Sequence, residues 1–131
     1  MKTIRTTIKV KDETIKGTIR EEVRKYGCEA DLNHIDTSEV TSMWDMFHYS
    51  QFNGDISLWN VSNVKDMLFM FAQSKFNGDI SLWNVSKVVD MNCMFFNSPF
   101  NGDISNWILN PKNKDEDILK RIKHSDRKSV V

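Results

Sequence analysis

The sequence has few of the residues that build a disulfide scaffold or a compact metal centre. It holds only two cysteines and two prolines in 131 residues. Cys28 and Cys93 lie far apart, and neither has a metal-ligating residue at a suitable spacing, so they do not define a disulfide framework. We expect both to be reduced and buried, as free cysteines commonly are.

Long apolar runs and a charge surplus are also lacking. No run approaches the roughly 20 apolar residues of a membrane-spanning helix, and residues 1–9 lack the apolar core of a secretion signal. The 18 basic residues balance the 18 acidic ones, whereas a nucleic-acid-binding domain carries a basic surplus. The sequence therefore predicts a cytoplasmic protein without a membrane or nucleic-acid partner. The alternative is a bacterial surface protein whose leader has been removed.

One phrase is repeated at a constant spacing. The run Phe-Asn-Gly-Asp-Ile-Ser begins at Phe52, Phe76 and Phe100, and a tryptophan follows each copy after one intervening residue. Similarity at a fixed period of this length is the signature of a solenoid, in which each unit buries its apolar face against the next.

The register extends back to a degenerate first copy. When the sequence is aligned with itself after a shift of one repeat, Asp31 aligns with Asp55 and Leu32 aligns with Ile56. Cys28 then aligns with Phe52. Mainly apolar positions persist, as expected for the core of a capping repeat. The predicted boundaries are 1–27 for an N-terminal strand–helix cap; 28–51, 52–75, 76–99 and 100–107 onward for the units of the 28–107 solenoid; and 108–131 for a C-terminal helical cap and tail.

Both caps have recognisable patterns. Residues 3–10 alternate between apolar and polar side chains, which predicts a half-buried strand. Asp12 is the expected N-cap of a helix whose apolar stripe starts at Ile15, and Gly27 is its expected end. Residues 115–123 are predicted to form the second capping helix, because its acidic start and basic end complement the helix dipole.

Each central unit divides into two halves. The first follows an Asn-Gly pair, which favours a tight turn with positive φ, and its Ile, Trp and Val residues predict a short strand. The second half has Met67, Met70 and Phe71 at helical spacing, which predicts a short helix with its methionines in the core. We expect Trp59, Trp83 and Trp107 to stack inward. The predicted fold is a short right-handed α/β solenoid with about four 24-residue strand–helix coils and a cap at each end.

The unit Phe-Asn-x-Asp-Ile-Ser-x-Trp-x-Val-Ser-x-Val-x-x-Met-x-x-Met-Phe resembles the BspA-like leucine-rich-repeat family, also known as the bacterial surface lipoprotein repeat. The resemblance covers residues 28–107. It implies a solenoid with a short parallel sheet, and a role in protein–protein interaction and adhesion without enzymatic activity. The array is short here, and it lacks the export signal and anchor of the surface members.

No catalytic constellation is recognisable, so we expect neither an enzyme nor a cofactor. The recurring Asp55, Asp79 and Asp103 could in principle bind calcium, but one carboxylate per unit supplies too few oxygens for this ion. We expect each aspartate to accept N–H bonds within its own turn instead. The repeated asparagines are expected to satisfy turn backbone in the same way; these are Asn53, Asn77 and Asn101.

Binding surfaces on solenoids commonly use outward positions that vary between units. The predicted partner-binding residues are Leu58, Leu82, Asn106, Phe96, Lys65 and Lys87. Two interpretations of Leu58 and Leu82 stay open: they form an exposed apolar strip, which favours a partner site, or they fill the core.

The predicted function is a non-catalytic protein–protein interaction module, a monomer or weak dimer that occludes or scaffolds a protein partner. A phage or mobile-element inhibitor of a host defence complex would fit such a small, neutral binder. The alternative function is a surface adhesin or lipoprotein repeat fragment.

Overall fold

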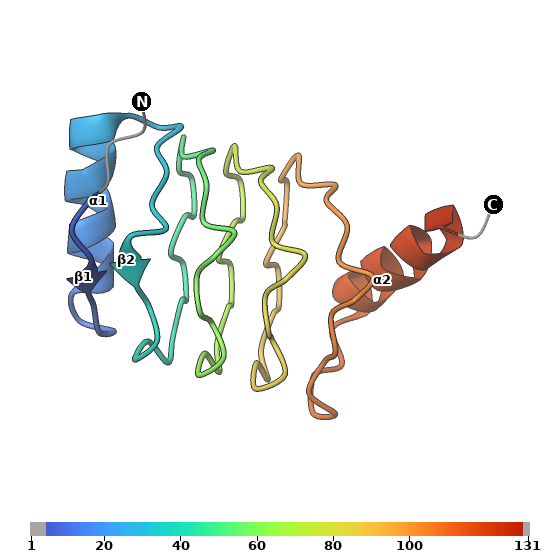
Figure 1. Ribbon diagram of the computed structural model, residues 1–131. Helices are drawn as coiled ribbons and strands as arrows, with labels where there is room; N and C mark the ends of the chain where they lie inside the picture. Colours follow the sequence, from blue (N-terminus) through green and yellow to red (C-terminus); the bar gives the residue numbers. More distant parts are fainter. Residues whose placement is uncertain (1–4, 130–131) are drawn as a thin grey trace.

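Two helices lie at opposite ends of a run of similar loops (Figure 1). The computed structural model describes residues 5–129, and side chains for residues 5–123. The elements in chain order are β1 (Ile8–Lys9), α1 (Ile15–Tyr26), β2 (Ile35–Asp36) and α2 (Glu116–Ser129). Most of the chain between β2 and α2 forms turns and irregular segments around a buried aromatic core.

The strand predicted at the N-terminus is short. β1 pairs in parallel with β2, with Ile8 opposite Ile35 and Lys9 opposite Asp36. Residues 1–4, which include the first part of the predicted strand, lie outside the described residues. The pair joins the N-terminal segment to the first repeat unit.

The predicted helix is confirmed at Ile15–Tyr26. Ile15 and Ile19 of its apolar stripe are buried in the common core. Gly27 has a φ of 95° and ends the helix, because this region of conformational space favours glycine.

The predicted N-cap is wrong. Thr14 takes that position, and the carboxylate of Asp12 accepts hydrogen bonds from the N–H groups of Thr41 and Ser42 at 2.7 and 3.3 Å. The Thr41 hydroxyl donates to the same carboxylate. Asp12 therefore ties the entrance of α1 to the first repeat unit rather than to the helix itself.

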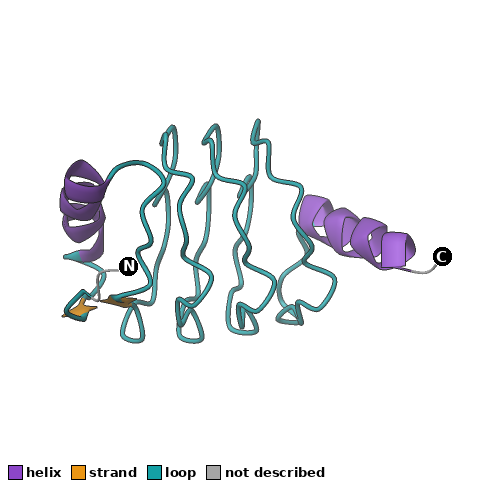
Figure 2. Ribbon diagram, turned by 45° about the horizontal axis from the view of Figure 1, so that its top comes forward, coloured by secondary structure: helices purple, strands orange, loops and turns teal. Residues whose placement is uncertain are grey.

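The register of the repeat recurs in the backbone pairing. Segments one repeat apart lie side by side in both views (Figures 1 and 2). Parallel bridges join Asp31 to Asp55, Ser42 to Asp66, and Asp66 to Asp90. The degenerate first copy therefore pairs with the second copy in the register that the sequence predicts, and its predicted core residue Leu32 is fully buried.

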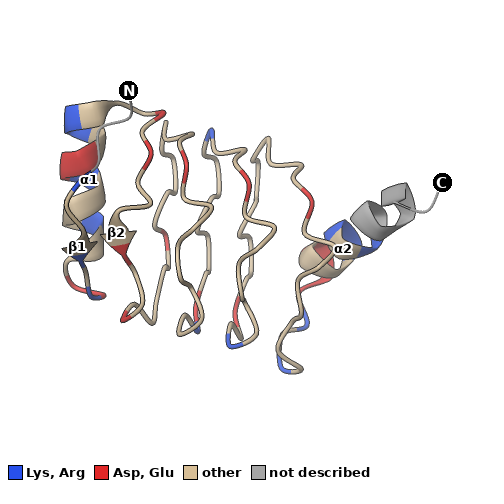
Figure 3. Ribbon diagram, in the orientation of Figure 1, with Lys and Arg blue, Asp and Glu red and all other residues tan. Residues whose placement is uncertain are grey.

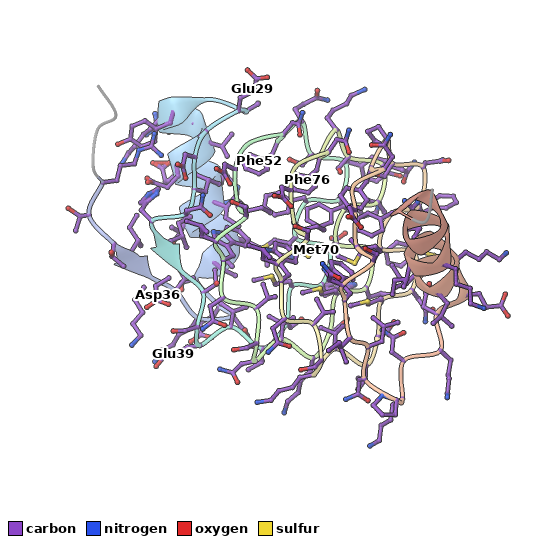
Figure 4. All side chains as sticks on the ribbon, turned by 45° about the vertical axis from the view of Figure 1, so that its right-hand side comes forward. Glu29, Asp36, Glu39, Phe52, Met70 and Phe76 are labelled. Atoms are coloured by element: carbon purple, nitrogen blue, oxygen red, sulfur yellow. The ribbon has the colours of Figure 1, made fainter. Side chains whose placement is uncertain are left out.

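Two columns of phenylalanine fill the core. In the first column, Phe47, Phe71 and Phe95 stack with ring centres 5.5 and 5.8 Å apart. In the second, Phe52, Phe76 and Phe100 are spaced by 6.3 Å at both steps. The columns meet where the rings of Phe71 and Phe76 lie 4.4 Å apart. Figure 4 shows Phe52, Phe76 and Met70 inside the stack, with Glu29 and Glu39 at its periphery.

The tryptophans face inward, as predicted. Trp59, Trp83 and Trp107 are all buried, and the indole N–H of each donates to a carbonyl oxygen of the preceding unit. The acceptors are Leu32 at 2.9 Å, Ile56 at 3.1 Å and Ile80 at 2.9 Å, respectively. Each tryptophan therefore joins two units by a hydrogen bond as well as by packing.

The short helix predicted in each unit is wrong. Residues 43–50, 67–74 and 91–98 instead form consecutive hydrogen-bonded turns, which we call ribbons 1, 2 and 3. In ribbon 2, Met70, Ala72 and Ser74 donate their N–H groups three residues back. The alternate donors Met67, Phe69, Phe71 and Gln73 bond instead to carbonyl groups of ribbon 3 and its flanking residue Asp90, at 2.7–3.1 Å. The spacing of three that suggested a helix is satisfied equally by these turns.

The ribbons contain an unusual backbone conformation. Six residues other than glycine have φ between 51° and 63°, two in each ribbon: Asp45 and Tyr49, Phe69 and Gln73, Cys93 and Asn97. Positive φ at the third position of a turn is the mark of a type II turn. This conformation disfavours side chains with a Cβ, and it recurs at equivalent positions of all three ribbons.

The Asn-Gly pairs do not form the predicted positive-φ turns. Among the described glycines, positive φ occurs only at Gly27. A Cβ added to Gly54 would lie 2.0 Å from the carbonyl oxygen of Ala30 and 2.7 Å from the Phe52 ring. Close approach between units, rather than turn geometry, therefore requires glycine here. The regular strand expected after Asn-Gly is also missing, and an isolated bridge at Asp55 marks its place.

Both cysteines are free, but the prediction that they are buried is wrong, because Cys28 and Cys93 are exposed. Cys28 directly follows the end of α1, outside the core position that Phe52 fills in the next unit. Cys93 is at the position in ribbon 3 that is equivalent to Phe69 in ribbon 2 and Asp45 in ribbon 1.

The second capping helix is confirmed and extends further than predicted, from Glu116 to Ser129. Ile118 is buried, and Arg121 fixes the helix to the last unit. Its guanidinium donates to the carbonyl oxygen of Phe100 at 2.8 Å and lies 4.8 Å from the centre of the Phe95 ring. The rest of the helix projects away from the loops (Figure 2).

Candidate protein-interaction surface

Leu58 and Leu82 lie on the outside of the molecule, 74% and 80% exposed. Asn106 is exposed at the equivalent position of the next unit. We call these three residues the leucine surface. Of the two interpretations left open by the sequence, the structure selects the exposed apolar strip.

The local turn explains why these leucines face outward. The Asp55 carboxylate accepts a hydrogen bond from the N–H of Ser57 at 2.9 Å, and the N–H of Trp59 donates to the carbonyl oxygen of Ile56 at 3.1 Å. Ile56 and Trp59 are both buried in the core. Leu58, which directly precedes Trp59, therefore points away from the core. The side-chain oxygen of Asn33 fixes Leu58 further by accepting its N–H at 2.8 Å.

The repeated aspartates bond within their own turns, as predicted. Asp79 and Asp103 each accept the N–H and the hydroxyl of the serine two residues on. The Ser81 N–H holds the pKa of Asp79 below its ordinary value, although Asp55 and Asp103 oppose the shift. The acidic positions recur on neighbouring loops (Figure 3). The described residues contain no group of three side chains suited to a metal ion.

The repeated asparagines form a ladder between units. Asn53 accepts the N–H of Asn77 through its side-chain oxygen at 2.8 Å, and Asn77 accepts the N–H of Asn101 at 3.1 Å. The asparagines thus satisfy backbone donors, as predicted, but the donors belong to the next unit.

The other predicted partner-binding residues do not join the leucine surface. Phe96 is 53% exposed but belongs to ribbon 3, in the other half of its unit. Lys65 and Lys87 are exposed in the links that lead to the ribbons. The Lys87 ammonium donates to the side-chain oxygen of Asn63 at 3.2 Å. These residues therefore mark separate parts of the surface.

An aromatic cluster on ribbon 1 escaped the sequence analysis. The ring of His48 stacks on Tyr49 at 4.2 Å and on Phe69 at 5.6 Å. Its Nδ1 contacts Asp45 at 2.5 Å, and its Nε2 contacts Gln73 at 3.3 Å. A comparison of ribbon 1 with ribbon 2 at equivalent positions would have found it, because His48 and Tyr49 stand where ribbon 2 has Ala72 and Gln73.

A groove lies next to this cluster, between α1 and ribbon 1. Its volume is about 380 Å³. The lining residues are Lys16, Ile19, Arg20 and Val23 of α1 and Asp45, Met46, Phe47 and Ser50 of the first unit. The Lys16 ammonium also lies 4.9 Å above the ring of Trp44, which is half exposed at the side of the groove.

The repeat array and its C-terminal helix fall within a known family. The model of the family described as "Mycoplasma protein of unknown function, DUF285" matches residues 18–129, and the chain belongs to this family. No match was found among curated proteins or among solved structures. Within residues 5–129, neither helix has the length and apolar character to span a bilayer.

Proposed function

We propose that the 24-residue units form a short right-handed solenoid similar to that of BspA-like leucine-rich repeats, closed at its ends by α1 and α2. The parallel bridges between equivalent positions of adjacent units and the tryptophan bonds between units support this assignment. The units differ from strand–helix coils, because consecutive turns replace the helix.

We further propose that this solenoid is a non-catalytic protein-binding module. The observation that carries the proposal is the strong exposure of Leu58 and Leu82 on adjacent units. Neighbouring apolar side chains within a polar surface are typical of the centre of a protein interface. The Asn33 side chain holds the Leu58 backbone by a hydrogen bond of 2.8 Å, which limits the backbone entropy lost on binding.

The mechanism we infer is occlusion or scaffolding. The leucine surface would cover a matching apolar patch on the partner, while the aspartates and serines of the adjacent turns form a polar rim. Inhibition of a host defence complex is one form that such occlusion could take, and it stays a prediction.

The test is affinity capture with matched variants. Wild-type protein, Leu58→Asp/Leu82→Asp and Val89→Asp would be immobilised after circular dichroism has established that each is folded. Val89 is an exposed apolar residue outside the leucine surface, and it serves as the control. We expect a specific protein to be retained by wild type and by the control but lost from the double variant. Retention by all three proteins contradicts the proposal.

We propose the cytoplasm as the site of action. Two exposed, free thiols fit a reducing compartment. The adhesin role implied by the BspA-like resemblance predicts the opposite location. Protease treatment of intact cells separates the two, because only a surface-displayed protein would be degraded before lysis.

A further inference from the structure

The backbone hydrogen bonds between ribbons run in one direction along their length, and only at the flank does Lys75 donate back to the Ser50 carbonyl of ribbon 1, at 3.0 Å. Alternate N–H groups of ribbon 1 donate to ribbon 2, and those of ribbon 2 donate to ribbon 3. The alternate carbonyl groups point the opposite way and act as acceptors. The acceptors in and directly before ribbon 2 are Asp66, Leu68, Met70 and Ala72, which receive bonds of 2.8–3.1 Å from ribbon 1.

Ribbon 1 has no ribbon before it, so its own acceptor row is unused. The carbonyl oxygens of Trp44, Met46 and His48 have no hydrogen-bond donor within the part of the chain that the structure describes. They are equivalent in register to the ribbon 2 acceptors, and of the three residues Met46 lines the groove beside α1. α1 lies beside ribbon 1 without supplying backbone donors, and the groove of about 380 Å³ separates the two.

The chemistry of the groove specifies what could fill it. Its floor is apolar, with Phe47 and Ile19 buried. Lys16 and Arg20 are exposed on the α1 side, and neither forms an ion pair with another described residue. The lining also holds one carboxylate, Asp45, which contacts His48 Nδ1 at 2.5 Å. The groove therefore suits an occupant with three features: backbone N–H groups that reach the free carbonyls of ribbon 1, an apolar side chain that contacts the floor, and carboxylates that face Lys16 and Arg20 of α1.

We propose that this groove binds an extended, acidic peptide segment of a protein partner, which adds to ribbon 1 by donating N–H groups to the carbonyls of Trp44, Met46 and His48. Extended segments commonly bind by adding to an open backbone edge, where main-chain bonds give affinity and side-chain pockets give specificity. This site is separate from the leucine surface and does not depend on it.

A second copy of the chain is a less suitable occupant. Ribbon 3 does hold the complementary donors, because the N–H groups of Met91, Cys93 and Asn97 have no acceptor among the described residues. However, α2 lies at that end, with Arg121 over the Phe95 ring and Ile118 buried. End-to-end pairing would therefore require α2 to leave its position.

The experiment uses the full chain and two pools of fluorescein-labelled decapeptides. One pool alternates Glu with Val, Leu or Phe, and the matched pool has Lys in place of Glu. Fluorescence anisotropy should detect the acidic pool and not the basic pool. Arg20→Glu should weaken binding by about tenfold or more, because a like charge replaces an attractive one. The control Arg24→Glu changes an exposed α1 residue outside the groove and should change affinity by less than about twofold.

Backbone pairing has its own test. N-methylation of alternate residues removes every second N–H donor from the best peptide. One of the two alternate sets should abolish binding, and the other should leave it largely intact, because an extended segment directs only alternate N–H groups toward one edge.

Four outcomes would overturn the proposal. The first is no binding of the acidic pool at about 1 mM peptide, and the second is equal binding of the two pools. The third is loss of peptide binding in Leu82→Asp but not in Arg20→Glu, which would place the peptide on the leucine surface. The fourth is a concentration-dependent dimer that Arg20→Glu abolishes, which would make a second copy the occupant.

Discussion

The indole N–H of Trp83 donates to the carbonyl oxygen of Ile56, in the preceding unit, at 3.1 Å, and both residues are buried. The same bond recurs at Trp59 and Trp107. Each of these carbonyl oxygens also accepts a backbone N–H within its own turn, so the tryptophan supplies a second, inter-unit hydrogen bond and satisfies its own buried indole N–H.

Replacement of this donor should destabilise the protein. We expect Trp83→Phe to lower the free energy of unfolding by about 1 kcal/mol, because the inter-unit hydrogen bond is lost while the Ile56 carbonyl keeps the Trp59 N–H as a donor. Urea denaturation measures the change. Trp44→Phe is the control at a half-exposed tryptophan and should cost much less. Equal losses in the two variants would show that the hydrogen bond contributes nothing.

The asparagine ladder should contribute at each step. Asn77→Ala removes the oxygen that accepts the Asn101 N–H, and we expect a loss of about 1 kcal/mol in unfolding free energy. Hydrogen exchange should also become faster at the Asn101 amide. Asn92→Ala changes an exposed asparagine outside the ladder and serves as the control. Unchanged exchange at Asn101 in Asn77→Ala would contradict the prediction.

Low pH should reduce the free energy of unfolding, partly because Asp79 becomes protonated. The hydrogen bonds from Ser81 lower the pKa of this carboxyl in the folded state below its ordinary value of 3.8. The ionised form therefore stabilises the fold above that value, and the contribution is lost as the pH falls through the folded pKa. We expect Asp79→Asn to reduce the drop in urea midpoint between about pH 6 and about pH 3.

The comparison for the acid experiment is Asn92→Ala, which changes an exposed side chain without a titrating group. This variant should keep the wild-type pH dependence. Identical slopes for Asp79→Asn and wild type would show that the turn bond does not couple to folding.

Relief of the positive φ at Cys93 should stabilise the protein. Cys93 is exposed and has a φ of 56°, and asparagine tolerates this region better than most residues. Cys93→Asn should raise the free energy of unfolding by up to about 1 kcal/mol. Cys28→Asn tests the loss of an exposed thiol outside the positive-φ positions, and it should be nearly neutral. A decrease in stability for Cys93→Asn would contradict the conformational argument.

The sequence predicted the features that depend on the period. The inward tryptophans and the hidden unit at Asp31 follow from the register alone, because a position that repeats at a constant spacing meets the same environment in every unit. The exposed Leu58 and Leu82 were predicted as one of two alternatives. The choice depended on how the chain leaves the predicted Asp55 turn, because burial of both Ile56 and Trp59 turns Leu58 outward.

The second half of each unit could not be predicted in the same way. Met67 and Met70 lie at a spacing of three, which suits both a helix and a chain of turns. The deciding factor is where the intervening N–H groups bond: Phe69 donates to Asn92 of the next ribbon, and this is a contact between distant segments. The groove at α1 escaped for a related reason, because it exists only where the repeat begins and has no counterpart in later units.

The asparagine ladder also has a consequence for the length of the array. Asn53 to Asn77 and Asn77 to Asn101 are equivalent steps, so removal or duplication of one 24-residue block leaves each ladder donor opposite an equivalent acceptor. A chain engineered with one unit more or one unit fewer should therefore still fold, with α1 and α2 at its ends.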